Sequence, residues 1–266
     1  MSQRVNVTID NEIASVEFNR PDKRNALDLE MFCAIRDTIK KLKRMKSLRG
    51  VLLTGQGEDF CSGLDVKSVL LSKSHGIRLL WKWLPGQPNL AQFVSVGFRQ
   101  LPVPVVSAIH GRCWGGGLQI ALGTDFRIAT PDASISIMEG KWGLIPDMGG
   151  TLALRECMPA DQAMYLAMSA KELTAAEALE MRLLLEVHEN PQERGREMLE
   201  ELSRRSPDSI AGVKKLYQQA WHRNDRAMLA RETWYQLRII AGKNQSIAVK
   251  RETKQKDIPY QNRKSW

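Results

Sequence analysis

Residues 103–122 read VPVVSAIHGRCWGGGLQIAL, and this stretch contains the pattern that decides the fold. The first seven residues are mostly apolar and β-branched, which is typical of a short buried strand. A loop at 110–114 follows, then the glycine triplet 115–117, and then an apolar run at 118–122 that predicts a helix. The stretch therefore predicts a strand, a glycine-bearing loop and a helix start, which is one unit of an α/β protein.

The same design occurs earlier in the chain, where the buried strand VLLT (51–54) leads through GQGED (55–59) to FCSGLD (60–65). Before it, alternating residues predict strands at 5–9 and 13–18, and Asp28 is expected to cap a helix whose apolar residues recur at 29, 32, 35, 39 and 42. Residues 66–100 predict helix with an interruption near 85–88, and 125–129 and 134–137 predict further strands. From Gly149 onward helices dominate, with a capping box from Thr174 to Glu177 and a helix start at Ser206-Pro207. The chain is therefore expected to have an α/β core and a helical C-terminal part.

The composition is that of an ordinary globular protein, with 266 residues, 43% hydrophobic and 26% charged, and it indicates neither disorder nor a fibre. The N-terminus runs directly into the first predicted strand, so we expect no leader sequence. The longest apolar stretches fall short of a membrane span. The four cysteines form no CxxC pair, which favours reduced thiols and a cytoplasmic protein. The four scattered histidines suggest neither a zinc site nor a Ser/His/Asp triad.

The net charge of +9 invites a nucleic-acid interpretation, but the charge is concentrated at one end. Residues 243–266 hold seven Lys or Arg against two acids, so they carry +5 of the +9. We interpret this segment as a solvated tail or a subunit contact, and polyanion binding as the less favoured alternative.

The two glycine-bearing loops are candidate binding elements. Glycine permits a positive φ and close approach of a ligand, and free N–H groups at a helix start favour negative charge. Two such loops side by side could direct two N–H groups at one oxygen, as in an oxyanion hole. The alternative is that both are packing turns. A nucleotide site is not indicated, because neither GxGxxG nor GxxxxGK[ST] occurs.

Residues 137–150, IMEGKWGLIPDMGG, hold two carboxylates eight residues apart, Glu139 and Asp147. An apolar loop between them could double back and bring both to one pocket, where burial would raise their pKa values towards those useful for proton transfer. The alternative is that Asp147 caps the helix beginning near Gly149 and that Glu139 is a surface charge.

The order of these motifs resembles the enoyl-CoA hydratase/isomerase (crotonase) family. The resemblance covers essentially the whole chain and is carried by four motifs: Asn19-Arg20-Pro21 with Asn25-Ala26-Leu27, Gly55-Gln56-Gly57 with residues 60–65, His110-Gly111 with the glycine triplet, and Gly143-Leu144-Ile145-Pro146 with Gly149-Gly150. It implies a spiral of ββα turns over residues 1–200, followed by a helical trimerisation region over 201–266. It further implies an acyl-CoA substrate and a homotrimer or dimer of trimers. Neither a metal nor a separate cofactor is expected, because coenzyme A is part of the substrate.

The resemblance also implies roles for individual residues. The N–H groups of Leu64 and Gly116 would bind the thioester oxygen. The nucleotide and pantetheine of coenzyme A would lie along Lys23, Arg24, Ala26, Ser62, Gly63, Asp65 and Val66.

The acid/base positions depart from those of hydratases, which carry two glutamates. The first falls on Gln119, which cannot ionise, and the second matches Glu139. Asp147 stands where dienoyl-CoA isomerases carry a catalytic aspartate. The hypothesis is that Asp147 removes a proton and Glu139 returns one, with the reverse assignment open. The alternatives are hydration, thioester hydrolysis or dehalogenation, and a catalytically inactive binding homologue.

Four tryptophans are candidates for the acyl pocket. Trp81 and Trp83 lie in the segment that shapes acyl specificity in the family, and core packing is the favoured role for either. Trp114 and Trp142 are closer in sequence to the presumed chemistry and are the better candidates for contact with acyl atoms.

Overall fold

The computed structural model describes residues 4–70, 73–220, 224–254 and 257–266. Within these ranges a six-stranded sheet has the order β1-β2-β3-β4-β6-β9, and a three-stranded sheet has the order β5-β7-β8. The strands of the larger sheet are β1 (Val5–Asp10), β2 (Ile13–Phe18), β3 (Gly50–Gly55), β4 (Val105–Ile109), β6 (Phe126–Ala129) and β9 (Glu186–Val187). The strands of the smaller sheet are β5 (Arg112–Trp114), β7 (Ser134–Ser136) and β8 (Glu172–Thr174).

The larger sheet begins with an antiparallel pair, β1 and β2, and continues in parallel through β3, β4, β6 and β9. Parallel strands need crossover connections, and helices supply them here. The chain leaves β4, adds β5 to the second sheet, enters a helix, and returns through β6 and β7, which pair in parallel with β4 and β5. This repeat confirms the predicted ββα turns.

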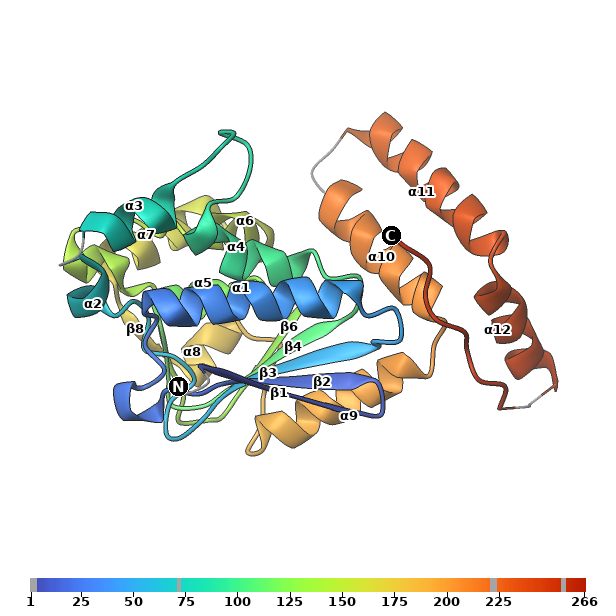
Figure 1. The fold of residues 1–266 in the computed structure, drawn as a ribbon, viewed down its shortest axis with the longest axis horizontal. Coiled ribbons are helices and arrows are strands. Elements are labelled where there is room, and N and C mark those ends of the chain that lie inside the picture. Colours follow the sequence, from blue (N-terminus) through green and yellow to red (C-terminus); the bar gives the residue numbers. More distant parts are fainter. Residues whose placement is uncertain (1–3, 71–72, 221–223, 255–256) are drawn as a thin grey trace.

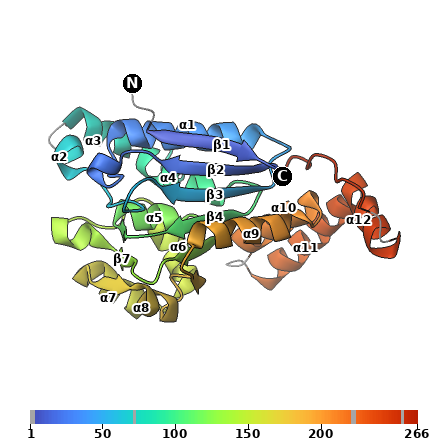
Figure 2. The same ribbon diagram turned by 90° about the horizontal axis from the view of Figure 1, so that it is seen from below.

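Helices cover both faces of the larger sheet (Figures 1 and 2). The helices of the core are α1 (Leu29–Arg44), α2 (Val66–Leu70), α3 (Lys73–Leu80), α4 (Leu90–Arg99), α5 (Gly116–Leu122), α6 (Gly150–Cys157), α7 (Ala160–Ser169), α8 (Ala175–Glu180) and α9 (Pro191–Ser203), with short 3₁₀ turns η1 (Pro21–Lys23) and η2 (Met138–Trp142). The predicted cap of α1 is confirmed, because the Asp28 carboxylate accepts from Met31 N at 2.8 Å. The predicted capping box of Thr174 and Glu177 at α8 is also confirmed.

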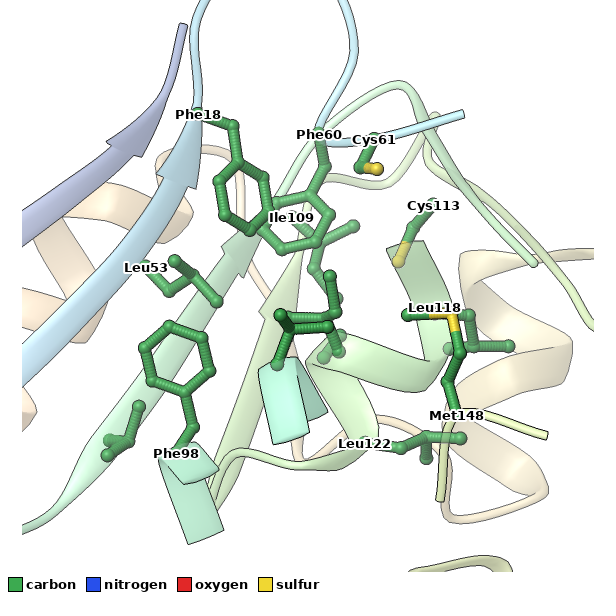
Figure 3. Packing of buried hydrophobic residues seen from close by; sticks show 14 of the residues in the cluster. Phe18, Leu53, Phe60, Cys61, Phe98, Ile109, Cys113, Leu118, Leu122 and Met148 are labelled. Atoms are coloured by element: carbon green, nitrogen blue, oxygen red, sulfur yellow. The ribbon is translucent and has the colours of Figure 1, made fainter. Parts of the chain in front are cut away.

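The main hydrophobic core lies between the sheet and the layer of α1, α4 and α5. Figure 3 shows Phe18, Phe60 and Phe98 within it, and the rings of Phe18 and Phe60 have their centroids 5.6 Å apart. On the opposite face α9 packs on β3 and β4, with Leu199 fully buried. The core thus fixes the ends of β3 and β4, from which the two glycine-bearing loops extend.

The C-terminal part consists of α10 (Pro207–Ala220), α11 (Asp225–Ile240) and α12 (Lys243–Lys254), which stand together at one end of the molecule (Figure 1). These helices confirm the predicted helical C-terminal part. The boundary at residue 200 and the trimerisation role of residues 201–266 stay predictions.

The interpretation of residues 243–266 as a solvated tail is wrong for its described last part. Arg263 is 4% exposed, and its guanidinium donates to the carbonyl of Met45 at 3.0 Å, while Lys264 N donates to Asp208 at 2.6 Å. The end of the chain therefore lies against the core, whereas Lys243, Lys250 and Lys254 earlier in this segment are exposed. Residues 255–256, at the middle of this segment, lie outside the described residues.

Candidate active site

Two glycine-bearing loops converge at one end of the sheet, as the sequence predicted. Cys61 pairs with Cys113 in a parallel bridge, since Cys61 N donates to Arg112 O at 3.0 Å and Trp114 N donates to Cys61 O at 3.0 Å. The loops touch at their glycines: a Cβ added to Gly63 would lie 2.8 Å from Trp114 O and 3.3 Å from the amide nitrogen of Gly116. The absence of a side chain at residue 63, with its φ of +94°, therefore allows this approach.

The parallel bridge between Leu27 and Leu64 turns the amide of Leu64 away from the segment of Leu27. Leu27 N donates to Gly63 O at 2.8 Å and Asp65 N donates to Leu27 O at 3.1 Å. In a parallel bridge of this kind Leu64 uses neither its own N–H nor its own C=O in the pairing. The amide of Gly116 is at the first position of α5, where an N–H has no carbonyl one turn earlier in the helix. Two N–H groups on touching loops thus remain for a ligand oxygen.

A cavity of about 190 Å³ opens beside these amides. Its lining comes from the glycine-bearing loop at 60–65, the start of α5, the helices α1 to α4 and the segment 138–148. The lining residues are Phe32, Ser62, Gly63, Leu64, Val66, Val69, Gly76, Leu79, Leu80, Ala91, Gly115, Gly116, Met138, Glu139, Trp142, Leu144, Ile145, Asp147 and Met148. Glu139 and Asp147 are the only carboxylates among these described lining residues, so the loop between them does bring both to one pocket.

The structural alternatives for these two carboxylates are wrong. Glu139 is 8% exposed and is not a surface charge. Asp147 does not cap α6, because Gly149 occupies the cap position and no side chain caps that helix. The pKa of Glu139 lies above its ordinary value, mainly because the carboxyl group is buried. The hydrogen bond from Gln119 lowers this pKa, and the nearby Asp147 raises it further. Burial also raises the pKa of Asp147, although this side chain is open to solvent at the cavity mouth.

Gln119 holds the two carboxylate-bearing segments together, a function that sequence reasoning missed. Its Nε2 donates to Glu139 Oε1 at 2.5 Å, and its Oε1 accepts from Met148 N at 2.8 Å and from Gly150 N at 3.2 Å. The two N–H donors fix which end of the amide faces Glu139. Glu139 Oε2 is buried and has no hydrogen-bond partner among the described residues.

The predicted coenzyme A residues fall into two groups. Ser62, Gly63 and Val66 line the cavity, whereas Lys23, Arg24, Ala26 and Asp65 do not. The two predicted segments nevertheless lie side by side, because Ser62 N donates to Arg24 O at 3.0 Å. The side chains of Lys23 and Arg24 are exposed there, as an anion-binding role would require.

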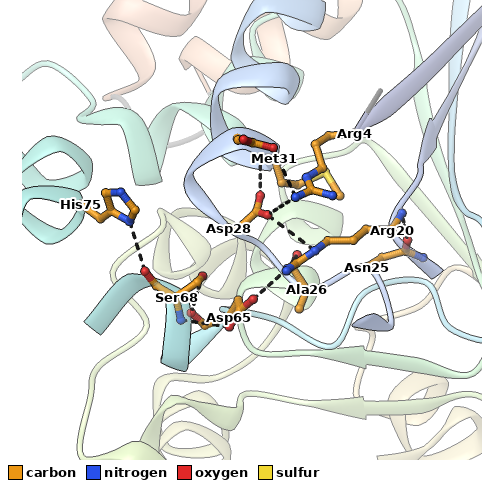
Figure 4. Close-up of polar contacts among 10 residues, drawn as sticks. Arg4, Arg20, Asn25, Ala26, Asp28, Met31, Asp65, Ser68 and His75 are labelled. Carbon is orange, nitrogen blue, oxygen red and sulfur yellow. Dashed lines mark hydrogen bonds and ion pairs between the residues drawn. The ribbon is translucent and has the colours of Figure 1, made fainter. Parts of the chain in front are cut away.

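Asp65 is engaged within the protein (Figure 4). Its carboxylate accepts from Arg20 at 2.9 Å and from Ser68 N at 3.1 Å, and Arg20 also lies 3.5 Å from the carboxylate of Asp28. Despite partial burial, these donors lower the pKa of Asp65. Asp65 therefore anchors the loop of Leu64 to the start of α1, and a direct contact with coenzyme A stays a prediction.

The tryptophan predictions were partly wrong. Trp142 lines the cavity as expected, but Trp114 does not, and its Nε1 donates to Ser134 Oγ at 2.9 Å. Trp81 and Trp83 were favoured as core residues, yet they are 61% and 89% exposed. They lie beyond the end of α3 and face each other edge to face, with their ring centroids 6.3 Å apart.

No helix within the described ranges is long and apolar enough to cross a bilayer. The described residues also contain no group of three or more His, Cys, Asp or Glu side chains that could hold a metal ion.

The fold is similar to several solved structures. An enoyl-CoA hydratase from Bacillus anthracis has 24% identity and a TM-score of 0.89, with 97% of this chain and 99% of that chain covered. An enoyl-CoA hydratase from Mycobacterium tuberculosis has 23% identity and a TM-score of 0.85, over 98% and 99% of the two chains. One from Thermoplasma volcanium has 24% identity and a TM-score of 0.83, over 94% and 97%. At these identities the likeness shows the fold alone.

The sequence itself matches a family model described as enoyl-CoA hydratase/isomerase over residues 8–257. The match includes both glycine-bearing loops, Gln119 and the two cavity carboxylates. The chain therefore belongs to the enoyl-CoA hydratase/isomerase (crotonase) family.

Proposed function

We propose that this enzyme isomerises the double bonds of an enoyl- or dienoyl-CoA by proton transfer through Asp147 and Glu139. The family implies an acyl-CoA substrate, and the choice of reaction rests on the acid/base groups. One observation carries the proposal: two carboxylates line the cavity beside the amides of Leu64 and Gly116. Residue 119, where hydratases have their first glutamate, is the non-ionising Gln119.

The first step uses the two amides. When the thioester oxygen accepts from Leu64 N–H and Gly116 N–H, negative charge that develops on that oxygen is stabilised, and removing one such donor typically costs about 3–4 kcal/mol. This stabilisation makes a proton on the acyl chain acidic. Asp147 is then the base, because its open position at the cavity mouth lets it ionise before the more buried Glu139. The electron pair of the broken C–H bond moves towards the thioester oxygen.

Glu139 is the acid in the second step. An ionised Asp147 and burial both favour the protonated form of Glu139. Because Gln119 donates to Oε1, the proton of a neutral Glu139 belongs on Oε2, the buried oxygen without a partner in the described protein. Glu139, which lines the cavity, gives this proton to the acyl chain further along, and the double bonds shift. Asp147 gains one proton and Glu139 loses one, so no atom is added to the substrate.

Hydration is the second candidate, since Glu139 matches one of the two glutamates of hydratases. Hydration adds water across the double bond, and thioester hydrolysis splits off coenzyme A. Both require a base that activates water, and Gln119, whose oxygen accepts two backbone N–H bonds, cannot be that base. Product mass separates these reactions.

The test compares Asp147→Asn and Glu139→Gln with the wild type on a 3,5-dienoyl-CoA, followed by diene absorbance. We expect kcat to fall by about 10²–10⁴-fold in each variant, which is the range for losing a positioned acid or base. The exposed residues Asp132 and Glu180 provide matched controls, Asp132→Asn and Glu180→Gln, which should retain full activity. Full activity of both cavity variants would refute the proposal.

A further inference from the structure

Residues 77–84 form an exposed apolar tip. They include the end of α3 and the beginning of the connection to α4, which projects from the edge of the molecule in Figure 1. The exposed fractions are 64% for Ile77, 56% for Leu80, 61% for Trp81, 89% for Trp83 and 61% for Leu84. Exposed apolar side chains that follow one another so closely are typical of an interaction site, unlike single exposed residues scattered over a surface.

The 77–84 segment is apolar on its inner side as well. Leu79 is 4% exposed and lines the catalytic cavity together with Leu80 and Gly76. Core packing therefore accounts for Leu79, but it does not account for the outward residues. The tip lies at the mouth of the cavity, so whatever covers it lies next to the entrance.

The charged residues of the tip and of the segment that precedes it are all basic. The sequence contains no Asp or Glu between Asp65 and Asp125, whereas residues 66–84 contain Lys67, Lys73, Arg78 and Lys82. Arg78 is exposed and Lys82 half-buried, and both lie within the apolar tip. The segment thus presents apolar and basic groups together, and its positive charge is complementary to an anionic surface.

We propose that the 77–84 segment binds the surface of an anionic phospholipid bilayer and so holds the cavity entrance against the membrane. Exposed Trp and Leu combined with Lys and Arg are the residues that insert at the boundary of headgroups and acyl chains. Trp prefers this boundary because its ring is apolar and its N–H can stay hydrated. Anionic lipid adds electrostatic attraction for the basic groups.

This placement has a consequence for substrate supply. A long-chain acyl-CoA is an amphiphile whose chain partitions into bilayers, with its charged part at the surface. An entrance at the headgroup level would receive such a molecule without passage of the free chain through water. Binding to lipid is measured without turnover, so this proposal and the proposed reaction succeed or fail separately.

The experiment measures co-sedimentation of the whole protein with two kinds of vesicle. One consists of phosphatidylcholine alone, and the other contains about 30 mol% phosphatidylglycerol, whose anionic headgroups give the vesicle a negative surface potential. We expect binding to the mixed vesicles that weakens with salt. In Trp81→Ser/Trp83→Ser the partition coefficient should fall by at least about tenfold, because two large rings leave the interface. In Arg78→Gln and in Lys82→Gln it should fall by about fivefold each.

Two exposed residues on the C-terminal helices provide matched controls. Trp234 on α11 is 59% exposed, and Lys254 ends α12. Trp234→Ser and Lys254→Gln should bind vesicles like the wild type. All variants should turn over a short, water-soluble dienoyl-CoA at the wild-type rate, which shows that they fold.

Three results would overturn the proposal. The wild type could stay in the supernatant with both kinds of vesicle, or the Trp234→Ser control could lose as much binding as the double variant. Alternatively, sedimentation velocity without lipid could show that Trp81→Ser/Trp83→Ser changes the size of the oligomer. The tip would then be a contact between copies of this chain.

Discussion

Replacing Gln119 by glutamate changes little in size but places a second carboxylate against Glu139. One oxygen of the new side chain can still accept from Met148 N and Gly150 N, whereas the other takes the position of Nε2, 2.5 Å from Glu139 Oε1. If each unit charge is taken at the centre of its carboxylate, the two charges lie about 4 Å apart. At an effective dielectric constant near 20 they repel by about 4 kcal/mol, equivalent to about three pKa units. The pair in Gln119→Glu should therefore keep one shared proton up to about neutral pH.

The sign of the stability change follows from this raised pKa. Below about pH 4 the carboxyls are protonated in both the folded and the unfolded chain, and the pair costs nothing. As pH rises, the unfolded chain releases its protons first, so the variant loses stability relative to the wild type until pH passes the raised folded pKa. We expect the free energy of unfolding of Gln119→Glu to fall below that of the wild type by about 4 kcal/mol between pH 4 and 8.

Urea unfolding of the wild type and of Gln119→Glu at pH 4.5, 6 and 8 measures this difference. The exposed Gln162 on α7 offers a matched control, because Gln162→Glu introduces the same charge away from Glu139. A difference between wild type and Gln119→Glu that stays constant with pH would refute the inferred contact of residues 119 and 139. So would an equal pH dependence in Gln162→Glu.

Two further predictions concern the glycine-bearing loops and the thiols beneath them. Gly63→Ala places a methyl group 2.8 Å from Trp114 O, at a residue whose φ is +94°. We therefore expect kcat/KM in steady-state assays to fall at least about 100-fold. An unchanged kcat/KM would contradict the inferred convergence of the loops. Burial raises the pKa of Cys61 to about 12 and that of Cys113 well above its ordinary value. At pH 8 these two thiols are therefore protonated and should react slowly with a chromogenic disulfide reagent. We expect fast reaction of at most two of the four cysteines.

Much of the fold could be predicted because its signals are local. The cap at Asp28, the capping box from Thr174 and the buried strands each depend on residues close together in the chain. The convergence of the loops could also be predicted, since Gly63 and Gly115 permit backbone conformations with positive φ that most residues avoid. The resemblance to the family then connected these loops to one oxygen.

The failures have a common physical origin in contacts between distant segments. The interaction of Gln119 with Glu139, Met148 and Gly150 depends on three chain segments, and no spacing indicates it. The burial of Arg263 depends on carbonyl groups near Met45, more than two hundred residues earlier.

The exposure of the two adjacent tryptophans has a different explanation. Trp81 and Trp83 were assigned to the core because large aromatic residues usually gain by burial. The helix ends at Leu80, before them, and the connection carries them outward. Residues 66–84 contain four Lys or Arg and no acid, and this was the signal in the sequence that could have marked the segment as basic.

The most direct test of the proposed reaction is the mass and structure of the product formed from a 3,5-dienoyl-CoA in D₂O. We predict a double-bond isomer whose heavy-atom composition is unchanged and which contains one deuteron, because the acid proton of Glu139 exchanges with solvent before it is transferred. A product heavier by one molecule of D₂O, or release of free coenzyme A, would contradict isomerisation by Asp147 and Glu139.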